Sequence, residues 1–378
     1  MRRAFGKYIF ITREIIFVEF FDDFRKIIID EVPLIDVRAP IEFEKGSFRN
    51  TVNIPILSNK QRELVGKKYK EEGNEAATKL GYELTKEDKN EKVDQWVRFI
   101  DNNPNCLIYC FRGGQRSEIA QKWIYEKTGK IIPRIKGGYK AIRNYLIDML
   151  LPENQNYQAY RLGGLTGVGK TILLHEINEM IDLEGLANHR GSIFGPKIDP
   201  QPRQIDFEDN LAYDLIQKQS KGYNFLIFED EGRHVGKSFL PHKFYEFLSN
   251  SPLIVLEASF DQRVDNIMQE YVYDEQKEYN KEFGSEGLDK WQEYINESIT
   301  KAESRLGNKR YKELIELVDE AVKKQKNFND KSGHKKWISR FLSNYYDPMY
   351  KYQLEKGSDL IVFKGNQEEV KKFIKSIR

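Results

Sequence analysis

Residues 157–171 read YQAYRLGGLTGVGKT, an apolar run followed by a glycine-rich loop. The spacing of Gly164, Gly169, Lys170 and Thr171 is that of a Walker A motif, and an apolar helical stretch follows it. In this motif the loop between a strand and a helix wraps a phosphate group with backbone N–H groups, and the lysine reaches an outer phosphate oxygen. The stretch therefore predicts a P-loop domain, with Thr171 placed to hold Mg²⁺ if a metal ion is used. The predicted phosphate-binding residues are Gly164, Leu165, Thr166, Gly167, Val168, Gly169, Lys170 and Thr171.

On both sides of this motif, short apolar runs rich in β-branched residues alternate with amphipathic segments. This alternation predicts an α/β architecture with parallel sheets. Proline and polar residues at 151–156 follow an apolar helix and predict a domain boundary. We expect an N-terminal extension at 1–19, a first domain at 20–152 and the P-loop domain at 153–378, with a helical insertion at about 274–326. Strands are expected at 33–37, 106–110, 157–162, 224–228, 253–257 and 359–363, and helices at 86–101 and 117–128.

A second strand of the predicted P-loop domain ends in acidic residues. Residues 225–231 read FLIFEDE, an apolar run that leads to the position where a Walker B carboxylate belongs. Glu229 and Asp230 are the supporting residues predicted here, and the sequence leaves open which acid faces the site.

The first domain contains a cysteine in a basic, glycine-rich loop. Residues 107–117 read LIYCFRGGQRS, an apolar strand that ends in Cys110 and a loop that opens a helix. Such a loop aims backbone N–H groups and the positive end of the helix dipole at one point. We expect it to stabilise the thiolate of Cys110 beside an anion site, to which Arg112 or Arg116 adds charge. Cys110 is the predicted catalytic residue, whereas Cys106, inside the strand, is predicted to be core. The predicted anion-binding residues are Arg112, Gly113, Gly114, Gln115, Arg116 and Ser117.

Length and composition limit the class of protein. The 378 residues, 39% of them hydrophobic, suffice for two packed domains. The longest apolar runs are shorter than the roughly 18 residues of a membrane helix, so no membrane partner is expected. Two cysteines four residues apart on one predicted strand favour a reducing cytoplasm over a disulfide. Because the net charge is only +2, a nucleic-acid partner would have to be held by local basic patches.

The first domain resembles the rhodanese family over roughly residues 20–150. The resemblance rests on the Cys110 loop and on three upstream segments, LIDVRAPIEF at 34–43, GSF at 46–48 and VNIP at 52–55. It implies that Cys110 carries transferable sulfur or selenium, and that Asp36 and Arg38 are supporting residues. Five residues separate Cys110 from Arg116, one more than in the common sulfurtransferase loop. A longer loop favours a larger, tetrahedral anion over thiosulfate.

Across nearly the whole chain, the sequence resembles the tRNA 2-selenouridine synthase family. Five blocks in order carry this resemblance: the Cys110 loop, the Walker A motif, NHRGSIFG at 188–195, EDEGR at 229–233 with VG at 235–236, and YYDPMY at 345–350. Gly232 departs from the serine expected after the acidic pair, and residues 1–18 lie outside the family pattern. The tyrosines of the last block could stack on bases, but packing is the favoured interpretation.

The resemblance implies an enzyme that replaces the sulfur of wobble 2-thiouridine in tRNA by selenium from selenophosphate. It also implies an S-geranyl intermediate, made from geranyl diphosphate, in which sulfur becomes part of a better leaving group. The tetrahedral selenophosphate suits the Cys110 loop, and a diphosphate suits the P-loop. No tightly bound cofactor is implied, and the partners are tRNA and an enzyme that supplies selenophosphate. Contacts to tRNA are expected at Arg190, Lys197, Arg203 and Arg233, and along the basic stretch 331–340.

Two other classes of function stay open. The first is a nucleotide-dependent enzyme, kinase-like or a sulfurtransferase, in which the P-loop binds ATP or GTP and the rhodanese-like domain donates sulfur. The second is a non-catalytic phosphate-binding or RNA-binding adaptor. Nucleotide hydrolysis that depends on Lys170 would favour the first, and tolerance of the loss of Cys110 would favour the second.

Overall fold

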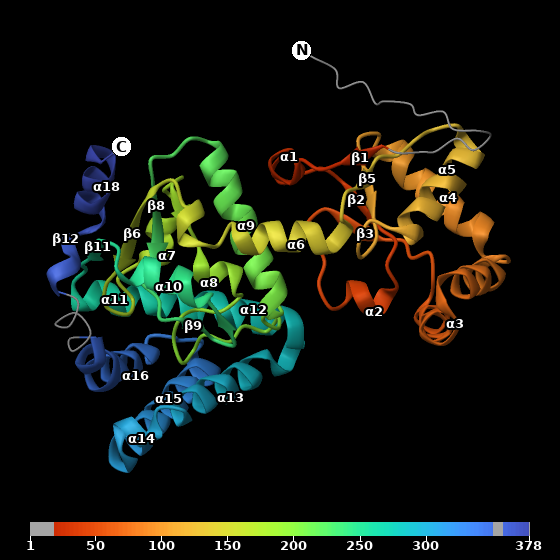
Figure 1. Cartoon of the computed structure of the whole chain (residues 1–378). Coiled ribbons are helices and arrows are strands. Elements are labelled where there is room, and N and C mark those ends of the chain that lie inside the picture. Colours follow the sequence, from red (N-terminus) through yellow and green to blue (C-terminus); the bar gives the residue numbers. More distant parts are fainter. Residues whose placement is uncertain (1–18, 351–357, 378) are drawn as a thin grey trace. The chain divides into compact units, whose positions relative to one another are not determined.

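The protein is described by a computed structural model that covers residues 19–350 and 358–377. It divides into two compact units, each built around its own five-stranded parallel sheet (Figure 1). The first unit holds the described residues up to Asn154 together with Glu208–Ser220, and the second holds Gln155–Phe207 and the described residues from Lys221 onward. The α/β class with parallel sheets predicted from the sequence is confirmed.

The sheet of the first unit has the strand order β1-β5-β4-β2-β3. Its central strand, β4 (Leu107–Tyr109), pairs with β2 (Leu34–Asp36), and these confirm the two strands predicted here. Cys106, Ile108 and Cys110 share one face of the sheet, because side chains alternate along a strand. The remaining strands are β1 (Phe20–Phe21), β3 (Thr51–Asn53) and β5 (Arg134–Ile135).

Two helices cover this face of the first sheet. α4 (Lys89–Asn102) and α5 (Gln115–Thr128) pack there, and they confirm the two helices predicted from the sequence within three residues at each end. Trp96 and Trp123 are the large side chains of this core, with ring centroids 6.3 Å apart. The unit also contains α1 (Phe24–Ile29), α2 (Pro40–Phe43), α6 (Gly138–Asp148) and a short 3₁₀ turn, Pro152–Asn154.

The longest helix of the first unit, α3 (Asn59–Thr85), was not predicted. It begins with a capping box at Ser58 and is interrupted at Gly73, whose φ of +85° divides it into two arms. Its buried side chains are Ala77 and Thr85. A helix with so few buried residues lacks the apolar periodicity by which sequence analysis recognises helices.

The sheet of the second unit has the order β12-β11-β6-β8-β7. Its four longer strands confirm those predicted, although β12 begins two residues late because residues 358–360 form a 3₁₀ turn. The two-residue strand β7 was too short to predict. The strands are β6 (Gln158–Gly163), β7 (Met180–Ile181), β8 (Phe225–Glu229), β11 (Leu253–Leu256) and β12 (Ile361–Gly365), and β9 (His234–Val235) pairs with β10 (Ser238–Phe239) in a separate hairpin.

The helices of the second unit form two groups. α7 and α18 pack against one face of the sheet, whereas the helices from α11 to α16 enclose a core of their own around Trp291 and Trp337. No helix in the described ranges is long and apolar enough to cross a membrane. The helices of the second unit are α7 (Lys170–Leu174), α8 (Leu183–Leu186), α10 (His242–Ser249), α11 (Phe260–Ile267), α12 (Glu275–Phe283), α13 (Gly287–Thr300), α14 (Glu303–Leu306), α15 (Asn308–Phe328), α16 (His334–Phe341) and α18 (Gln367–Ser376), with π-helical segments at Met268–Asp274 and Leu342–Tyr346 and a 3₁₀ turn at Gly284–Glu286. α9 (Gln204–Ser220) begins in the second unit, and its residues from Glu208 onward belong to the first.

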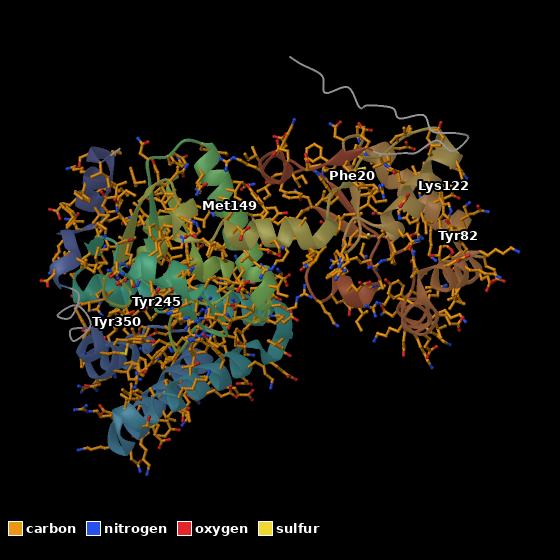
Figure 2. All side chains as sticks on the ribbon, in the orientation of Figure 1. Phe20, Tyr82, Lys122, Met149, Tyr245 and Tyr350 are labelled. Carbon is orange, nitrogen blue, oxygen red and sulfur yellow. The ribbon has the colours of Figure 1, made fainter. Side chains whose placement is uncertain are left out.

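Figure 2 shows the described side chains of both units, and its labelled residues locate elements that the site descriptions use. Tyr82 on α3 and Lys122 on α5 belong to the first unit. Tyr245 on α10 and Tyr350, which is near the P-loop, belong to the second unit.

Candidate functional site

Cys110 lies at the carboxyl end of β4, where the chain turns into α5. Its side chain is a free thiol, and the residue is 3% exposed. The Sγ atom lies 3.4 Å from the Oγ of Ser117, and that hydroxyl donates to the backbone oxygen of Gly114 at 3.0 Å. The structure therefore brings together three of the predicted residues, Cys110, Gly114 and Ser117. Cys106 is buried in the core as predicted, and burial raises the pKa of its thiol to about 11.

The first residues of α6 pack against the backbone of the Cys110 loop and support it. The N–H of Tyr139 donates to the carbonyl of Cys110 at 2.9 Å. Gly113 and Gly138 have φ values of +64° and +60°, and a Cβ atom on Gly138 would overlap the carbonyl of Cys110 and the nitrogen of Gly113. Gly138 was not predicted, although the glycine pair at 137–138 indicates that the backbone turns tightly there.

The two arginines of the loop have different roles. Arg116 donates to both carboxylate oxygens of Glu42, at 2.5 and 3.1 Å, so its charge is offset within the protein. Burial opposes ionisation of Glu42, yet the hydrogen bonds from Arg116 hold the pKa of that carboxyl below its ordinary value. Arg112 is exposed and has no ion-pair partner among the described residues. Of the two arginines predicted to add charge, Arg112 therefore retains a free charge for an external anion.

A buried ion pair supports this site from the neighbouring strand. Arg38 donates through Nε to Asp36 at 2.7 Å and through Nη2 to the carbonyl of Gly46 at 2.7 Å. The guanidinium also lies 3.9 Å from the ring centroid of Tyr139. Because the N–H of Tyr139 binds the carbonyl of Cys110, the pair helps to position the backbone beneath the cysteine.

Arg134 on β5 is a charged residue near the thiol that the sequence analysis missed. It is 4% exposed, and burial lowers its pKa while the charges of Glu118 and Cys110 oppose that shift. The Nε atom of Arg134 has no hydrogen-bond partner in the described structure. An isolated arginine in a short strand gives no sequence signal that it lies near the predicted catalytic cysteine.

Cys110 lines a cavity of about 1010 Å³ in the first unit. The Cys110 loop and α5 form one side of it, and the first arm of α3 forms another. Basic side chains from α3 add positive charge around the opening. The residues that line it are Leu57, Arg62, Glu63, Val65, Gly66, Lys67, Tyr69, Lys70, Asn74, Cys110, Phe111, Arg112, Gly114, Gln115 and Arg116.

The predicted phosphate-binding loop joins β6 to α7, as the Walker A pattern requires. Arg263 on α11 donates to the carbonyl of Thr166 at 2.8 Å, and Asn266 donates to the carbonyl of Gly167 at 2.8 Å. Arg263 is held in turn by both carboxylate oxygens of Asp347. The block at 345–350 thus helps to fix the loop.

The first two tyrosines of this block, Tyr345 and Tyr346, are buried against Phe341, which confirms that they pack in the core.

Lys170 lies among negative and aromatic groups. Its ammonium is 6.0 Å from the ring centroid of Tyr350. Burial lowers its pKa, but the nearby Tyr350, Glu231 and Glu184 outweigh that effect and raise it, so Lys170 stays protonated. A protonated lysine at the start of α7 is suited to an anionic ligand.

Of the two acids predicted at the end of β8, Glu229 and Asp230, neither lines the cavity at the P-loop. Glu229 is 2% exposed and accepts from the N–H of Glu184 at 2.8 Å, and burial raises its pKa well above the ordinary value. Asp230 is paired with Arg161 at 2.6 Å. The acid that does line the cavity is Glu231, and burial raises its pKa to about 8.

The cavity at the P-loop has a volume of about 420 Å³. Among the described residues, no cluster of three or more His, Cys, Asp or Glu side chains is arranged to hold a metal ion. A Mg²⁺ ion here would have to take most of its oxygen ligands from a bound phosphate and from water, beside the hydroxyl of Thr171. The lining residues are Leu165, Thr166, Gly167, Val168, Gly169, Lys170, Thr171, Ile172, His175, Glu184, Arg190, Gly191, Ser192, Glu231, Asn266, Gln269, Glu270, Tyr271, Asp274 and Tyr350.

The four residues predicted to contact tRNA differ in their surroundings. Arg190 lies in the P-loop cavity and pairs with Glu270 at 3.0 Å and with Glu275 at 2.5 Å. None of the other three residues lines this cavity. Arg203 pairs with Asp206, Arg233 contacts the carbonyl of Leu240, and Lys197 is exposed.

Together, the fold and the two loops define a two-domain α/β protein in which a rhodanese-like domain is joined to a P-loop domain. Residues 21–145 match the family model described as "Rhodanese-like domain", and residues 157–378 match the one described as "tRNA 2-selenouridine synthase AAA domain".

The chain is also similar to curated proteins over nearly their whole length. It is 48% identical to the tRNA 2-selenouridine synthase of Sulfurovum sp. (strain NBC37-1), over 94% of this chain and 98% of that protein. It is 43% identical to the protein of that name from Shewanella frigidimarina, over 93% and 96% of the two chains. For Pseudomonas aeruginosa (strain LESB58) the identity is 42%, over 92% and 95%. The chain belongs to the tRNA 2-selenouridine synthase family.

Gly138→Ala should disturb the Cys110 loop, because its new Cβ would overlap two backbone atoms of that loop. Gly129→Ala is the matched control, since Gly129 has a similar φ of +70° but no atom within 4 Å of its Cβ position. Both changes should cost about 1 kcal/mol through backbone strain. Gly138→Ala should lower the free energy of unfolding, measured in urea, by more than Gly129→Ala does. It alone should also change the rate at which iodoacetamide alkylates Cys110, measured by mass spectrometry. Equal effects of the two variants would contradict this role of Gly138.

The affinity of the P-loop for pyrophosphate should fall as the pH rises through about 8. Glu231, whose pKa is raised to about 8, is neutral below that pH and gains a negative charge beside the bound anion above it. Glu231→Gln should flatten this part of the profile, measured by calorimetric titration between pH 6.5 and 9. Pyrophosphate itself ionises in this pH range, and because that effect is the same for both proteins, the difference between their profiles reports on Glu231. Identical profiles for both proteins would show that Glu231 does not face the anion.

Proposed function

We propose that the protein is a tRNA-modifying transferase that replaces the sulfur of wobble 2-thiouridine by selenium from selenophosphate. The names of its relatives support the tRNA 2-selenouridine synthase reaction. Such an enzyme would work in the cytoplasm, where it would depend on an enzyme that makes selenophosphate. The observation that carries the proposal is the Cys110 loop, in which a free thiol lies in a glycine-rich loop that lines a large cavity.

The first chemical step proposed is geranyl transfer at the P-loop. The sulfur of 2-thiouridine attacks C1 of geranyl diphosphate, the C1–O bond breaks, and pyrophosphate leaves. The protonated Lys170 and the loop N–H groups are suited to stabilise the charge that develops on the leaving diphosphate. Mg²⁺, if bound through the diphosphate and Thr171, would neutralise further charge.

The second step proposed is selenium transfer at the Cys110 loop. Selenium from selenophosphate bonds to C2 of the uridine, and the C2–S bond breaks with release of geranyl thiol. Water then cleaves the Se–P bond, which releases phosphate and leaves 2-selenouridine. The free charge of Arg112 and the end of α5 are suited to hold the selenophosphate, and the thiol of Cys110 beside them is suited to give a proton to the departing geranyl thiolate.

The Walker A loop also favours a second candidate, an enzyme that uses ATP or GTP at this site with the rhodanese-like domain as sulfur donor. The positions of two of the three acids argue against it, and Glu231 is left as the acid that lines the cavity. Asp230 is engaged by Arg161, and Glu229 is bound to the backbone of Glu184, so neither lines the cavity. Hydrolysis of ATP or GTP that is lost in Lys170→Ala would decide in favour of this candidate.

Cys110→Ala should abolish formation of 2-selenouridine while leaving the fold nearly intact, because it removes a thiol from a loop and not a large core side chain. Cys106→Ala is the matched control and should keep the activity, since its thiol is buried and protonated at neutral pH. The measurement is mass spectrometry of nucleosides from tRNA incubated with selenophosphate. Normal conversion by the Cys110 variant would contradict its catalytic role.

Lys170→Ala should separate the two steps, because the proposal places the diphosphate at the P-loop and the selenophosphate at the Cys110 loop. Geranyl transfer to 2-thiouridine tRNA should be lost. With tRNA that is already S-geranylated, the variant should keep much of its selenation activity. Equal losses of both activities would overturn the two-site interpretation, and an unchanged rate of geranyl transfer would show that the P-loop does not bind the diphosphate.

A further inference from the structure

The two arms of α3 form an apolar pocket in the first unit. Gly73 interrupts the helix, and the second arm turns back along the first. A Cβ atom on Gly81, in the second arm, would lie 3.9 Å from Cγ2 of Val65, in the first arm, so the arms are in contact there. α5 and the segment after β3 supply the other walls. α3 also leaves large apolar side chains exposed, since Tyr69 is 58% and Tyr82 43% accessible.

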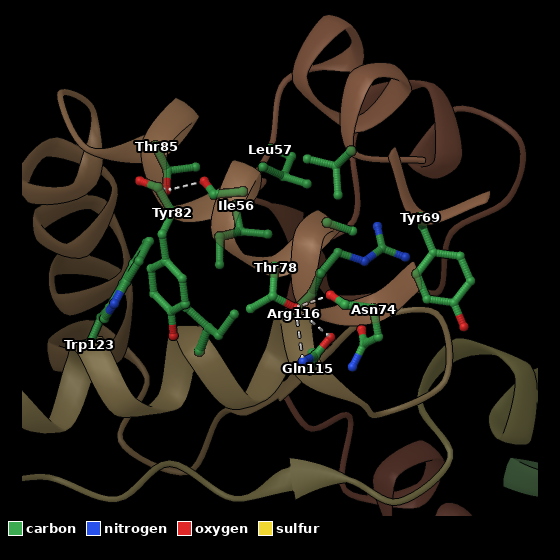
Figure 3. A pocket seen from close by; sticks show the side chains of 14 residues that line it. Ile56, Leu57, Tyr69, Asn74, Thr78, Tyr82, Thr85, Gln115, Arg116 and Trp123 are labelled. Carbon is green, nitrogen blue, oxygen red and sulfur yellow. Dashed lines mark hydrogen bonds between the residues drawn. The ribbon is translucent and has the colours of Figure 1, made fainter. Parts of the chain in front are cut away.

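The pocket has a volume of about 150 Å³ and is mostly apolar. Figure 3 shows Tyr82 and Trp123 next to each other on one side and Tyr69 on the opposite side, with Thr78 and Gln115 between them. The ring centroids of Tyr82 and Trp123 are 6.1 Å apart. The residues that line it are Ile56, Leu57, Val65, Tyr69, Asn74, Ala77, Thr78, Gly81, Tyr82, Thr85, Gln115, Arg116, Ile119 and Trp123.

This pocket adjoins the cavity that contains Cys110. Six residues line both: Leu57, Val65, Tyr69, Asn74, Gln115 and Arg116. Three of these are polar, Asn74, Gln115 and Arg116, whereas most of the residues that line the smaller pocket alone are apolar. Gln115 also donates to the hydroxyl of Thr78 at 3.1 Å, which ties α5 to α3 at the junction. The combined space suits a ligand with a polar reacting end and an apolar tail.

We propose that this pocket binds the geranyl chain of the S-geranylated uridine during selenium transfer. The inference rests on the proposed function, in which the S-geranyl group is expelled from C2 at the Cys110 loop. The chain is attached to the sulfur atom, so it must lie close to the thiol when selenium arrives. An apolar cavity of this size is comparable with one that holds a small hydrocarbon such as benzene. A longer chain can extend into the larger cavity, because the two cavities share lining residues.

The apolar lining excludes the other parts of the reactants. Selenophosphate and the phosphates of tRNA are charged, and placing them against Ile56, Ile119 and Trp123 would cost their hydration. The same walls favour a branched hydrocarbon, whose transfer from water is favourable in proportion to the apolar area buried. The pocket therefore distinguishes the S-geranyl substrate from unmodified 2-thiouridine.

The test measures binding of two nucleosides to the full chain by calorimetry: S-geranyl-2-thiouridine and S-methyl-2-thiouridine. The wild-type protein should bind the geranyl compound at least about tenfold more tightly. Gly81→Leu should remove this preference, because the leucine side chain would fill the pocket. The variant should fold, since the new Cβ atom would make only an ordinary van der Waals contact with Val65. Ala76→Leu places the same leucine side chain on α3 outside the pocket and should retain the preference.

Tyr82→Ala is a second variant, which removes one exposed wall of the pocket without filling it, and it should weaken the preference several-fold. Equal affinity of the wild type for both nucleosides would overturn the proposal. So would a preference that survives in a folded Gly81→Leu or in Tyr82→Ala. Failure of the proposed function gives a different result: wild-type protein with selenophosphate would not convert S-geranylated tRNA, whatever the nucleosides show.

Discussion

Both candidate sites depend on one constraint of the backbone, the turn from the end of a parallel strand directly into a helix. The turn leaves N–H groups at the helix start without partners inside the helix, and these groups attract anions. At Cys110 the turn is possible because Gly113 and Gly138 both have positive φ values and their backbones lie against each other. At the P-loop, Arg263 and Asn266 hold the turn through its carbonyl oxygens. The chemistry that we propose for each site depends on these supports.

Much of the fold and part of the site followed from local patterns. Buried strands with continuous apolar runs and the two loop motifs were visible, because each is encoded within some fifteen residues. The helix α3 could not be predicted, since it buries few side chains and its sequence, interrupted at the kink, shows no helical periodicity of apolar residues. Gly138 and Arg134 act on Cys110 from elements that follow it in sequence, and their function appears when β5 and α6 pack beside β4.

The charges were harder to predict than the motifs. Arg116 and Arg190 look similar in sequence to Arg112, yet each is neutralised by an acid that lies 74 or more residues away. Sequence shows where a positive charge is, but its availability to a ligand depends on long-range partners. The same reason explains why Glu231, and neither Glu229 nor Asp230, lines the P-loop cavity.

The link from Thr166 through Arg263 to Asp347 has a consequence for the order in which the protein matures during synthesis. The Cys110 loop gains its support as soon as residues up to Tyr139 have left the ribosome. The P-loop gains its direct support only when residues 263 and 266 have emerged, about 100 residues after the loop itself, and Arg263 gains its own partner only when residue 347 has emerged. Because chains fold from the N-terminus as they are made, the first sheet can form its cysteine loop while the P-loop remains unsupported. Nascent chains would thus pass through a stage that holds a formed thiol site and an incomplete phosphate site.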